Sequence, residues 1–288
     1  MMKLTMKLPT ILFKLISYFL FAVVLGLGQR PSVIFAEEMI MDIKHSKDST
    51  VQISSKQINS KGSGAIFNSD YVITAFHVIA KISDDGKNRM RWDVPSDLAV
   101  TFPDGETIQA TCVSLPSEAE PQPLLYDFAV LKLRVKPHGA WQSIALTDAP
   151  ETIEVGDEII FSGFPLATPG MVTHKGMISG FDAKKDLIFI QAPINKGNSG
   201  GLVLNQAGQA IGIMSMREGG ISKGLSDLSA YIETTSQHGS VKIMGVDPLQ
   251  STRAIIQTLD QYISTGIGYA ISIKFLKDYL AKHPLGNK

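Results

Sequence analysis

Three short stretches of the sequence contain the residue types that a nucleophilic catalytic site needs. Ser199 stands in the run KGNSGG, His77 in TAFHV and Asp127 in YDFAVLKL. A serine hydroxyl is a weak nucleophile until a base takes its proton, and the base needs an acid that orients it. The attacked carbonyl oxygen also needs hydrogen-bond donors for its developing negative charge. Together the three residues favour attack of a serine on a carbonyl group.

Each stretch also has an ordinary structural interpretation. The glycines around Ser199 suit a hairpin turn, but they also leave the backbone N–H groups of Gly197 and Ser199 unobstructed, as an oxyanion hole requires. His77 follows an apolar β-rich run, where a histidine is commonly a core residue. Asp127 opens an apolar strand, so it either faces solvent or pairs with a donor such as a histidine N–H. The combination of the three stretches favours catalysis.

The residues around these stretches predict a β-rich fold. Short runs rich in Val, Ile and Phe recur between turn signals, which indicates an all-β sandwich or barrel. Two amphipathic helices are expected near the C-terminus. One runs from Asp247-Pro248 to Gly266, and the other is capped by Ser272 and ends before Pro284. Their apolar faces are expected to pack against the β-structure.

Composition and the N-terminus restrict the partners and the compartment. The 27 basic and 27 acidic side chains balance, so no whole-protein field attracts nucleic acid or an anionic membrane. Lysines precede an uncharged run of 14 residues, 15–28, which is short of the roughly 20 that span a bilayer. We therefore expect residues 1–36 to be an export signal cut after Ala36, with a retained membrane anchor as the alternative. The single cysteine, Cys112, is expected to be a small buried residue rather than a reactive thiol.

The stretches with His77, Asp127 and Ser199, in that order, resemble the trypsin-like serine endopeptidases of the chymotrypsin fold, in particular the exported Deg-type proteases of bacteria. The resemblance covers about residues 50–216 and 266–283. Further matching stretches are VGDEIIFSGFP, MVTHKGMISG, QAPINKGNSGG, GQAIGIMSM and GIGYAISI.

The resemblance implies an all-β fold of two six-stranded antiparallel β-barrels. Residues 37–145 are expected to form the first barrel and residues 146–288 the second, with a C-terminal helix. The second half contains a helical insertion at 217–265, whose polar first part, REGGISKGLSDLSAYIETTSQHGS, is expected to be a surface loop. Such a loop either restricts substrates as a lid or is a neutral surface insertion.

The resemblance also implies residue roles. His77 is the general base and later the general acid, Asp127 orients it, and Ser199 is the nucleophile. The amides of Gly197 and Ser199 form the oxyanion hole, with Asn198 shaping the loop. The implied reaction is peptide-bond hydrolysis through an acyl-enzyme, with no cofactor and no metal. The sequence contains no HExxH, Cys/His cluster or phosphate-binding glycine motif that would argue otherwise.

The substrate pocket is expected where the residues before the serine meet the strand that follows it. These residues are Pro193, Ile194, Asn195, Met214, Ser215 and Met216. Because no carboxylate stands among them, we expect cleavage after uncharged, aliphatic residues rather than after Lys or Arg. Filling of the core is the alternative role for Met214 and Met216.

Two departures from the family pattern affect regulation. Asn198 stands where the digestive members carry an aspartate that pairs with a newly cut N-terminus, so this zymogen switch is not expected. No PDZ module is expected after the barrels in this polypeptide. The expected partners are protein or peptide substrates, with a membrane involved only if the N-terminal segment is retained, and the expected location is periplasmic or secreted. An oligomer is left open.

Two other functions compete with proteolysis. The same fold can bind extended peptides by adding a strand to a sheet edge, as a catalytically silent or latent protein. An esterase is disfavoured because the run GNSGG, although its letters match GxSxG, does not lead from a strand into a helix as a nucleophile elbow does.

Overall fold

The computed structural model describes residues 43–84, 90–114, 126–166, 168–217, 220–237, 239, 242–262 and 266–286. The expected export signal, residues 1–36, lies outside the described residues. None of the helices in the described parts of the chain combines the length and apolar content needed to cross a bilayer.

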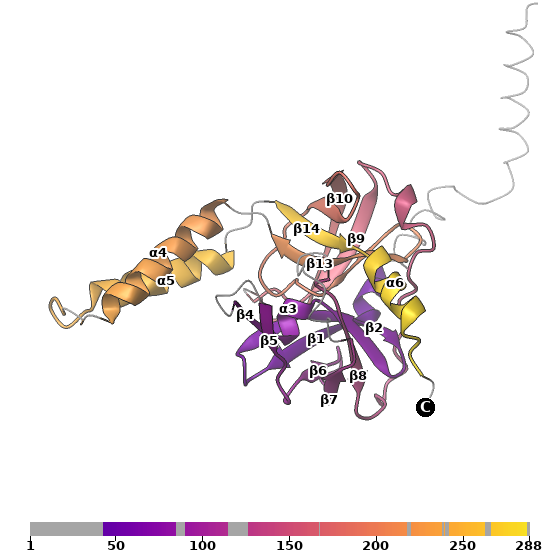
Figure 1. The fold of residues 1–288 in the computed structure, drawn as a ribbon, viewed down its shortest axis with the longest axis horizontal. Coiled ribbons are helices and arrows are strands. Elements are labelled where there is room, and N and C mark those ends of the chain that lie inside the picture. The colour runs from indigo at the N-terminus through magenta and orange to yellow at the C-terminus, as the bar shows by residue number, and fades with distance from the viewer. Residues whose placement is uncertain are drawn as a thin grey trace, which may run out of the picture. The chain divides into compact units, whose positions relative to one another are not determined.

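The first barrel is a closed sheet of six antiparallel strands, drawn in indigo to magenta in Figure 1. Neighbouring strands follow the order β1-β2-β3-β8-β7-β6. The strands are β1 (Thr50–Ser55), β2 (Ser60–Asn68), β3 (Tyr71–Thr74), β6 (Ala99–Thr101), β7 (Thr107–Cys112) and β8 (Ala129–Leu133). In β7, Ile108 and Ala110 are buried while their polar neighbours are not. This two-residue period turns one face of the strand towards the apolar interior of the barrel and the other towards solvent.

The second barrel is also a closed antiparallel sheet of six strands, in the order β10-β11-β14-β13-β12-β9. The strands are β9 (Glu158–Gly163), β10 (Val172–Phe181), β11 (Leu187–Gln191), β12 (Leu202–Leu204), β13 (Ala210–Arg217) and β14 (Ile267–Ser272). Ile188 and Ile190 of β11 alternate into a core that also contains Phe161 of β9. The predicted all-β fold of two six-stranded barrels is confirmed.

Several short elements lie outside the two barrel sheets. The one-turn helix α3 (Phe76–Ile79) follows β3, and a separate hairpin of β4 (Lys81–Asp84) and β5 (Met90–Asp93) follows α3. A 3-10 turn, η1 (Pro150–Thr152), lies between the barrels in the sequence. The C-terminal helix α6 (Lys274–Lys282) packs on the first barrel's core through fully buried Leu276, so the prediction that this helix covers the β-structure is confirmed.

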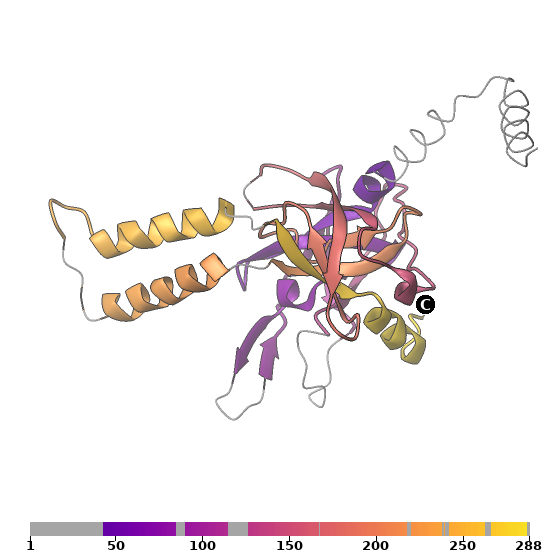
Figure 2. The ribbon, with the colours of Figure 1, turned by 90° about the horizontal axis from the view of Figure 1, so that it is seen from above.

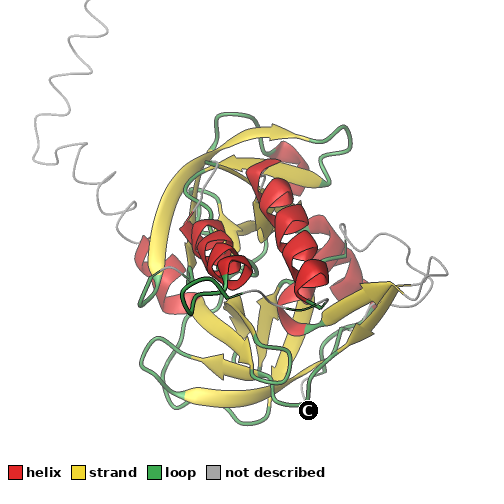
Figure 3. Cartoon of the chain, turned by 90° about the vertical axis from the view of Figure 1, so that its left-hand side faces the viewer, coloured by secondary structure: helices red, strands yellow, loops and turns green. Residues whose placement is uncertain are grey.

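The insertion differs from its prediction. Its first part is the 17-residue helix α4 (Gly220–Ser236), so the prediction of a surface loop there is wrong. Helix α5 (Pro248–Tyr262) starts as predicted, because Asp247 caps it by accepting from the N–H of Leu249 at 2.9 Å. However, α5 packs against α4, each helix has one buried isoleucine, Ile256 and Ile232, and the two helices lie together beside the barrels (Figures 1–3). The prediction that α5 packs on the β-structure is therefore wrong.

Candidate active site

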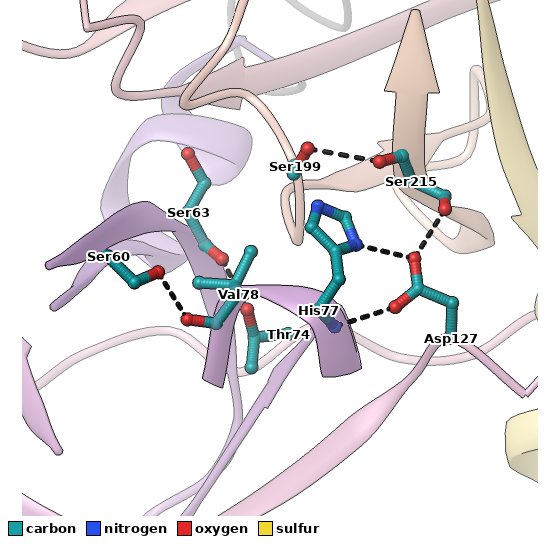
Figure 4. A network of polar contacts seen from close by, with 8 residues as sticks. All are labelled: Ser60, Ser63, Thr74, His77, Val78, Asp127, Ser199 and Ser215. Atoms are coloured by element: carbon teal, nitrogen blue, oxygen red, sulfur yellow. Dashed lines mark hydrogen bonds and ion pairs between the residues drawn. The ribbon is translucent and has the colours of Figure 1, made fainter. Parts of the chain in front are cut away.

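His77 lies at the point where β3 leaves the first barrel. Three of the four residues of α3, Phe76, Val78 and Ile79, are buried in the barrel core. His77 is the fourth, and its side chain keeps 39% of its surface exposed. The apolar run that precedes and surrounds the histidine thus fixes the helix, while the imidazole ring faces the opposite way (Figure 4).

Asp127 lies just before β8 and its side chain is only 8% exposed. One carboxylate oxygen, Oδ1, accepts the backbone N–H of His77 at 2.8 Å. The other, Oδ2, is 2.7 Å from Nδ1 of the same ring and also accepts the hydroxyl of Ser215. A buried carboxylate is stable only with such partners. With Nδ1 facing the carboxylate as a donor, Nε2 of His77 carries the lone pair that a general base needs.

The surroundings of His77 act on its pKa in opposite directions. Burial of the ring disfavours the imidazolium and lowers the pKa, whereas the hydrogen bond and the negative charge of Asp127 raise it. The raising effects win, so the pKa of His77 lies above its ordinary value of 6.5. The Asp127 carboxylate therefore stabilises the protonated ring.

The loop that carries Ser199 connects β11 to β12 and depends on its glycines. Gly197 has φ +97° and Gly200 has φ +88°, values that residues with a side chain rarely adopt. A Cβ at Gly197 would lie 2.2 Å from the carbonyl oxygen of Phe164, and one at Gly200 would lie 2.1 Å from that of Ser63. Both glycines are required by conformation and by space.

The backbone amides of Gly197 and Ser199 are oriented by the carbonyls of their own peptide units. The Lys196 carbonyl accepts the N–H of Leu166 at 2.8 Å, and the Asn198 carbonyl accepts the N–H of Gly201 at 3.0 Å. In a trans peptide the N–H points opposite to the C=O. The N–H groups of Gly197 and Ser199 therefore point away from these partners, and neither donates to an acceptor within the described part of the chain.

Ser215 connects the serine loop to the carboxylate. It lies at a β-bulge of β13, where the pairing with β14 shifts between Met214 and Met216. Its carbonyl oxygen accepts the Ser199 hydroxyl at 3.0 Å, while its own hydroxyl donates to Asp127. His77, Asp127, Ser215 and Ser199 thus belong to one continuous set of hydrogen bonds (Figure 4).

The residues predicted for the substrate pocket have different environments. Ile194 and Met214 are almost fully buried and belong to the core of the second barrel. Pro193 is exposed, and Asn195 is half-buried with a side-chain oxygen that has no partner among the described residues. Met216 lies in β13, but its side chain is outside the described part. Met214 therefore fills the core, and whether it also contacts a substrate stays a prediction.

Two contributions were not predicted from the sequence. The bond from Ser215 to Asp127 was missed because the serine was considered only as a lining residue, although a lone serine inside the apolar run AIGIMSM indicates a buried polar partner. Ser63, whose N–H and hydroxyl both donate to the serine loop, was not predicted either. The residues that the structure describes contain no group of three or more His, Cys, Asp or Glu side chains that would hold a metal ion.

The sequence of the chain matches the model of a known protein family. Residues 62–213, more than half of the sequence, match the family model of the trypsin-like peptidase domain. The chain belongs to this family. All three candidate catalytic residues lie within the matched range.

Relatives of this trypsin-like domain include named bacterial proteases. The chain is 31% identical over 160 residues to a probable periplasmic serine endoprotease DegP-like of Brucella suis, covering 54% of this chain and 27% of that protein. It is 30% identical over 172 residues to serine endoprotease DegS of Haemophilus influenzae, covering 57% and 43%. It is 31% identical over 203 residues to serine protease Do-like HtrB of Bacillus subtilis, covering 62% and 39%. The chain spans less than half the length of these relatives.

The fold of the trypsin-like domain also has a solved counterpart. A crystal structure of the serine endoprotease from Yersinia pestis aligns with a TM-score of 0.53 and 22% sequence identity, over 84% of this chain and 64% of that chain. At this identity the likeness shows a shared fold, which agrees with the two closed barrels.

The environment of His77 leads to a prediction for its titration. The Cε1–H resonance of His77, assigned by its loss in His77→Ala, should titrate above pH 6.5 in the wild type. In Asp127→Asn the charge is lost while burial remains, so the pKa should fall below that of the wild type. Because the folded-state pKa is raised, His77 adds stability below about pH 6.5 and this contribution fades as pH rises through the folded-state pKa. A wild-type pKa at or below 6.5 would contradict the arrangement.

Proposed function

We propose that this protein is a serine endopeptidase that hydrolyses peptide bonds in proteins through an acyl-enzyme intermediate. The observation that carries the proposal is the continuous hydrogen bonding of His77, Asp127, Ser215 and Ser199 beside two backbone amides without protein acceptors. These parts supply the base, the orienting acid, the nucleophile and the oxyanion donors of acyl transfer. The names of the relatives, which are serine endoproteases, support the same reaction.

The steps follow from the positions of these groups. Nε2 of His77 takes the proton of the Ser199 hydroxyl while Oγ attacks the substrate carbonyl carbon. The carbonyl oxygen gains negative charge and accepts from the N–H groups of Gly197 and Ser199. The imidazolium, stabilised by Asp127, then protonates the leaving amine. A water molecule, deprotonated by the same ring, releases the acyl group and restores the serine.

The Ser199 hydroxyl must first leave its present acceptor. It donates to the Ser215 carbonyl rather than to the imidazole. A change of its side-chain torsion redirects the proton towards His77, and such rotations are fast in partly exposed residues. This bond is also the observation that favours the second candidate function, a latent or silent peptide-binding protein in which the serine is not activated.

The place of action and the substrate class are also proposed. The name of the Brucella suis relative, a probable periplasmic serine endoprotease, and the predicted export signal at residues 1–36 support work outside the cytoplasm, in protein processing or quality control. Because no carboxylate stands among the predicted pocket residues, we propose cleavage after uncharged aliphatic side chains. A cationic side chain would have to lose its hydration there without a partner.

Labelling by a fluorophosphonate probe separates the enzyme from the binder. Wild type should gain the mass of one phosphonyl group on Ser199, and Ser199→Ala should gain none and lose casein hydrolysis by about 10⁴-fold or more. Ser229→Ala is the matched control substitution. Ser229 lies in helix α4, outside the two barrels, so this variant should label like wild type. Casein hydrolysis retained in Ser199→Ala would refute the assignment, and absent labelling of wild type would favour the latent protein.

Cleavage of a peptide library tests the substrate class. Sites with Val, Ile, Leu or Ala before the cut should be cleaved at least about 10-fold faster than sites with Lys or Arg, as expected when a buried pocket leaves a charge unpaired. The cut sites are identified by mass spectrometry of the products. Dominant cleavage after Arg would contradict the proposed pocket.

A further inference from the structure

Ser63 of β2 is a fully buried residue of the first barrel whose polar groups reach the serine loop of the second. Its backbone N–H donates to the Ser199 carbonyl at 2.8 Å. Its hydroxyl donates to the Gly197 carbonyl at 2.6 Å and accepts the N–H of Phe164 at 2.9 Å. Its own carbonyl accepts the Thr74 hydroxyl at 2.6 Å, as Figure 4 shows. All polar groups of Ser63 are therefore engaged.

These bonds complete the orientation of the two oxyanion residues. The peptide unit before Gly197 is held by the N–H of Leu166, and the unit after it is held by the Ser63 hydroxyl. The unit before Ser199 is held by the N–H of Gly201, and the unit after it is held by the Ser63 N–H. Each oxyanion residue is thus fixed on both sides, and Ser63 supplies one of the two bonds in both cases.

The loop needs such an external support because parts of it are unfavourable. Asn198 is fully buried, yet its side-chain oxygen and nitrogen have no hydrogen-bond partner among the described residues. A buried polar group without a hydrogen-bond partner destabilises the conformation that buries it. The flanking Gly197 and Gly200 also lose much conformational freedom when they are held at positive φ. The loop's own residues therefore do little to stabilise its conformation, and contacts from outside the loop have to do so.

The Ser63 hydroxyl also joins two segments of the second barrel that meet at the loop. Phe164 follows β9, and two residues later Leu166 binds the Lys196 carbonyl. Gly163 leaves the space for this junction, because a Cβ there would lie 3.0 Å from the Ser63 hydroxyl and 2.8 Å from the Asn198 side-chain oxygen. Loss of the hydroxyl would free both the Gly197 carbonyl and the segment that orients the preceding peptide.

We propose that Ser63 is a positioning residue that holds the oxyanion hole in its competent shape through its side-chain hydroxyl. The role rests on the proposed serine-peptidase function and goes beyond it, since Ser63 touches neither substrate nor reacting atoms. Without the hydroxyl, the Gly197 peptide rotates more freely and its N–H no longer points steadily at the substrate oxygen. The effect is expected in the transition state, where that oxygen carries charge, and not in ground-state binding.

Ser63→Ala is the direct test. Removal of one oxyanion donor costs about 10²–10³ in kcat, so a donor that is only loosened should cost about 10–100-fold, with KM changed less than about threefold. A peptide aldehyde, which forms a hemiacetal whose oxygen occupies the oxyanion hole, should bind weaker by a similar factor. The pH dependence of kcat/KM should keep its midpoint, because His77 and Asp127 are untouched.

Ser162→Ala is the matched control. Ser162 of β9 is also fully buried, and its hydroxyl binds those of Ser46 and Thr173, each at 2.8 Å, not the serine loop. Ser162→Ala should lower the melting temperature about as much as Ser63→Ala does. Its kcat and its affinity for the aldehyde should stay within about twofold of wild type. Ser63→Cys keeps the packing with a weaker donor, so it should show the same kinetic defect even if Ser63→Ala does not fold.

The outcomes distinguish the positioning role from a structural one. If kcat and aldehyde affinity of Ser63→Ala, or of Ser63→Cys where the alanine variant does not fold, match those of Ser162→Ala, the proposal is overturned. A proportional rise in KM with unchanged kcat would also overturn it. If wild type neither hydrolyses peptides nor reacts with the fluorophosphonate, the proposed function itself fails, and that result is visible without any Ser63 variant.

Discussion

The buried carboxylate of Asp127 is the constraint on which the site depends. It accepts from the backbone of His77, from the ring of His77 and from the hydroxyl of Ser215, so it ties α3 of the first barrel to β13 of the second. A buried charge has to be paired, and here its partners are the groups that the chemistry uses. The same carboxylate selects the ring tautomer and raises the pKa of His77. One carboxylate therefore both orients the base and joins the two barrels.

The site lies at the junction of two barrels, and each barrel orders a group of the other. The first barrel carries His77 and Asp127, but its Ser63 also fixes the loop of the nucleophile. The second barrel carries Ser199, but its Ser215 also binds the carboxylate. Neither barrel has a complete site of its own. This mutual dependence explains why Ser63 of β2 and Ser215 of β13 are buried although both are polar.

The sequence predicted the parts that local pattern determines. The alternation of apolar residues gave the strands, and motifs in the order His77, Asp127, Ser199 led by resemblance to the two barrels. The prediction for the first half of the insertion was wrong because Gly, Ser and Thr have low helix propensity, whereas α4 is supported by its contact with α5. The roles of Ser63 and Ser215 depend on the register and the bulge of β-strands, which single-sequence patterns do not determine.

A crystal structure of the protein with a peptide boronic acid would test whether Ser199 attacks a carbonyl group beside the backbone amides of Gly197 and Ser199, because the boron adopts the tetrahedral shape of the attacked carbon. We expect a covalent bond from boron to Ser199 Oγ, with one boronate oxygen accepting from the N–H groups of Gly197 and Ser199. The Ser199 hydroxyl would have left the Ser215 carbonyl, and Nε2 of His77 would lie next to the adduct. If Ser199 stays unmodified and hydrogen-bonded to Ser215 at saturating inhibitor, or if the oxygens of the adduct contact neither amide, the proposed mechanism is wrong.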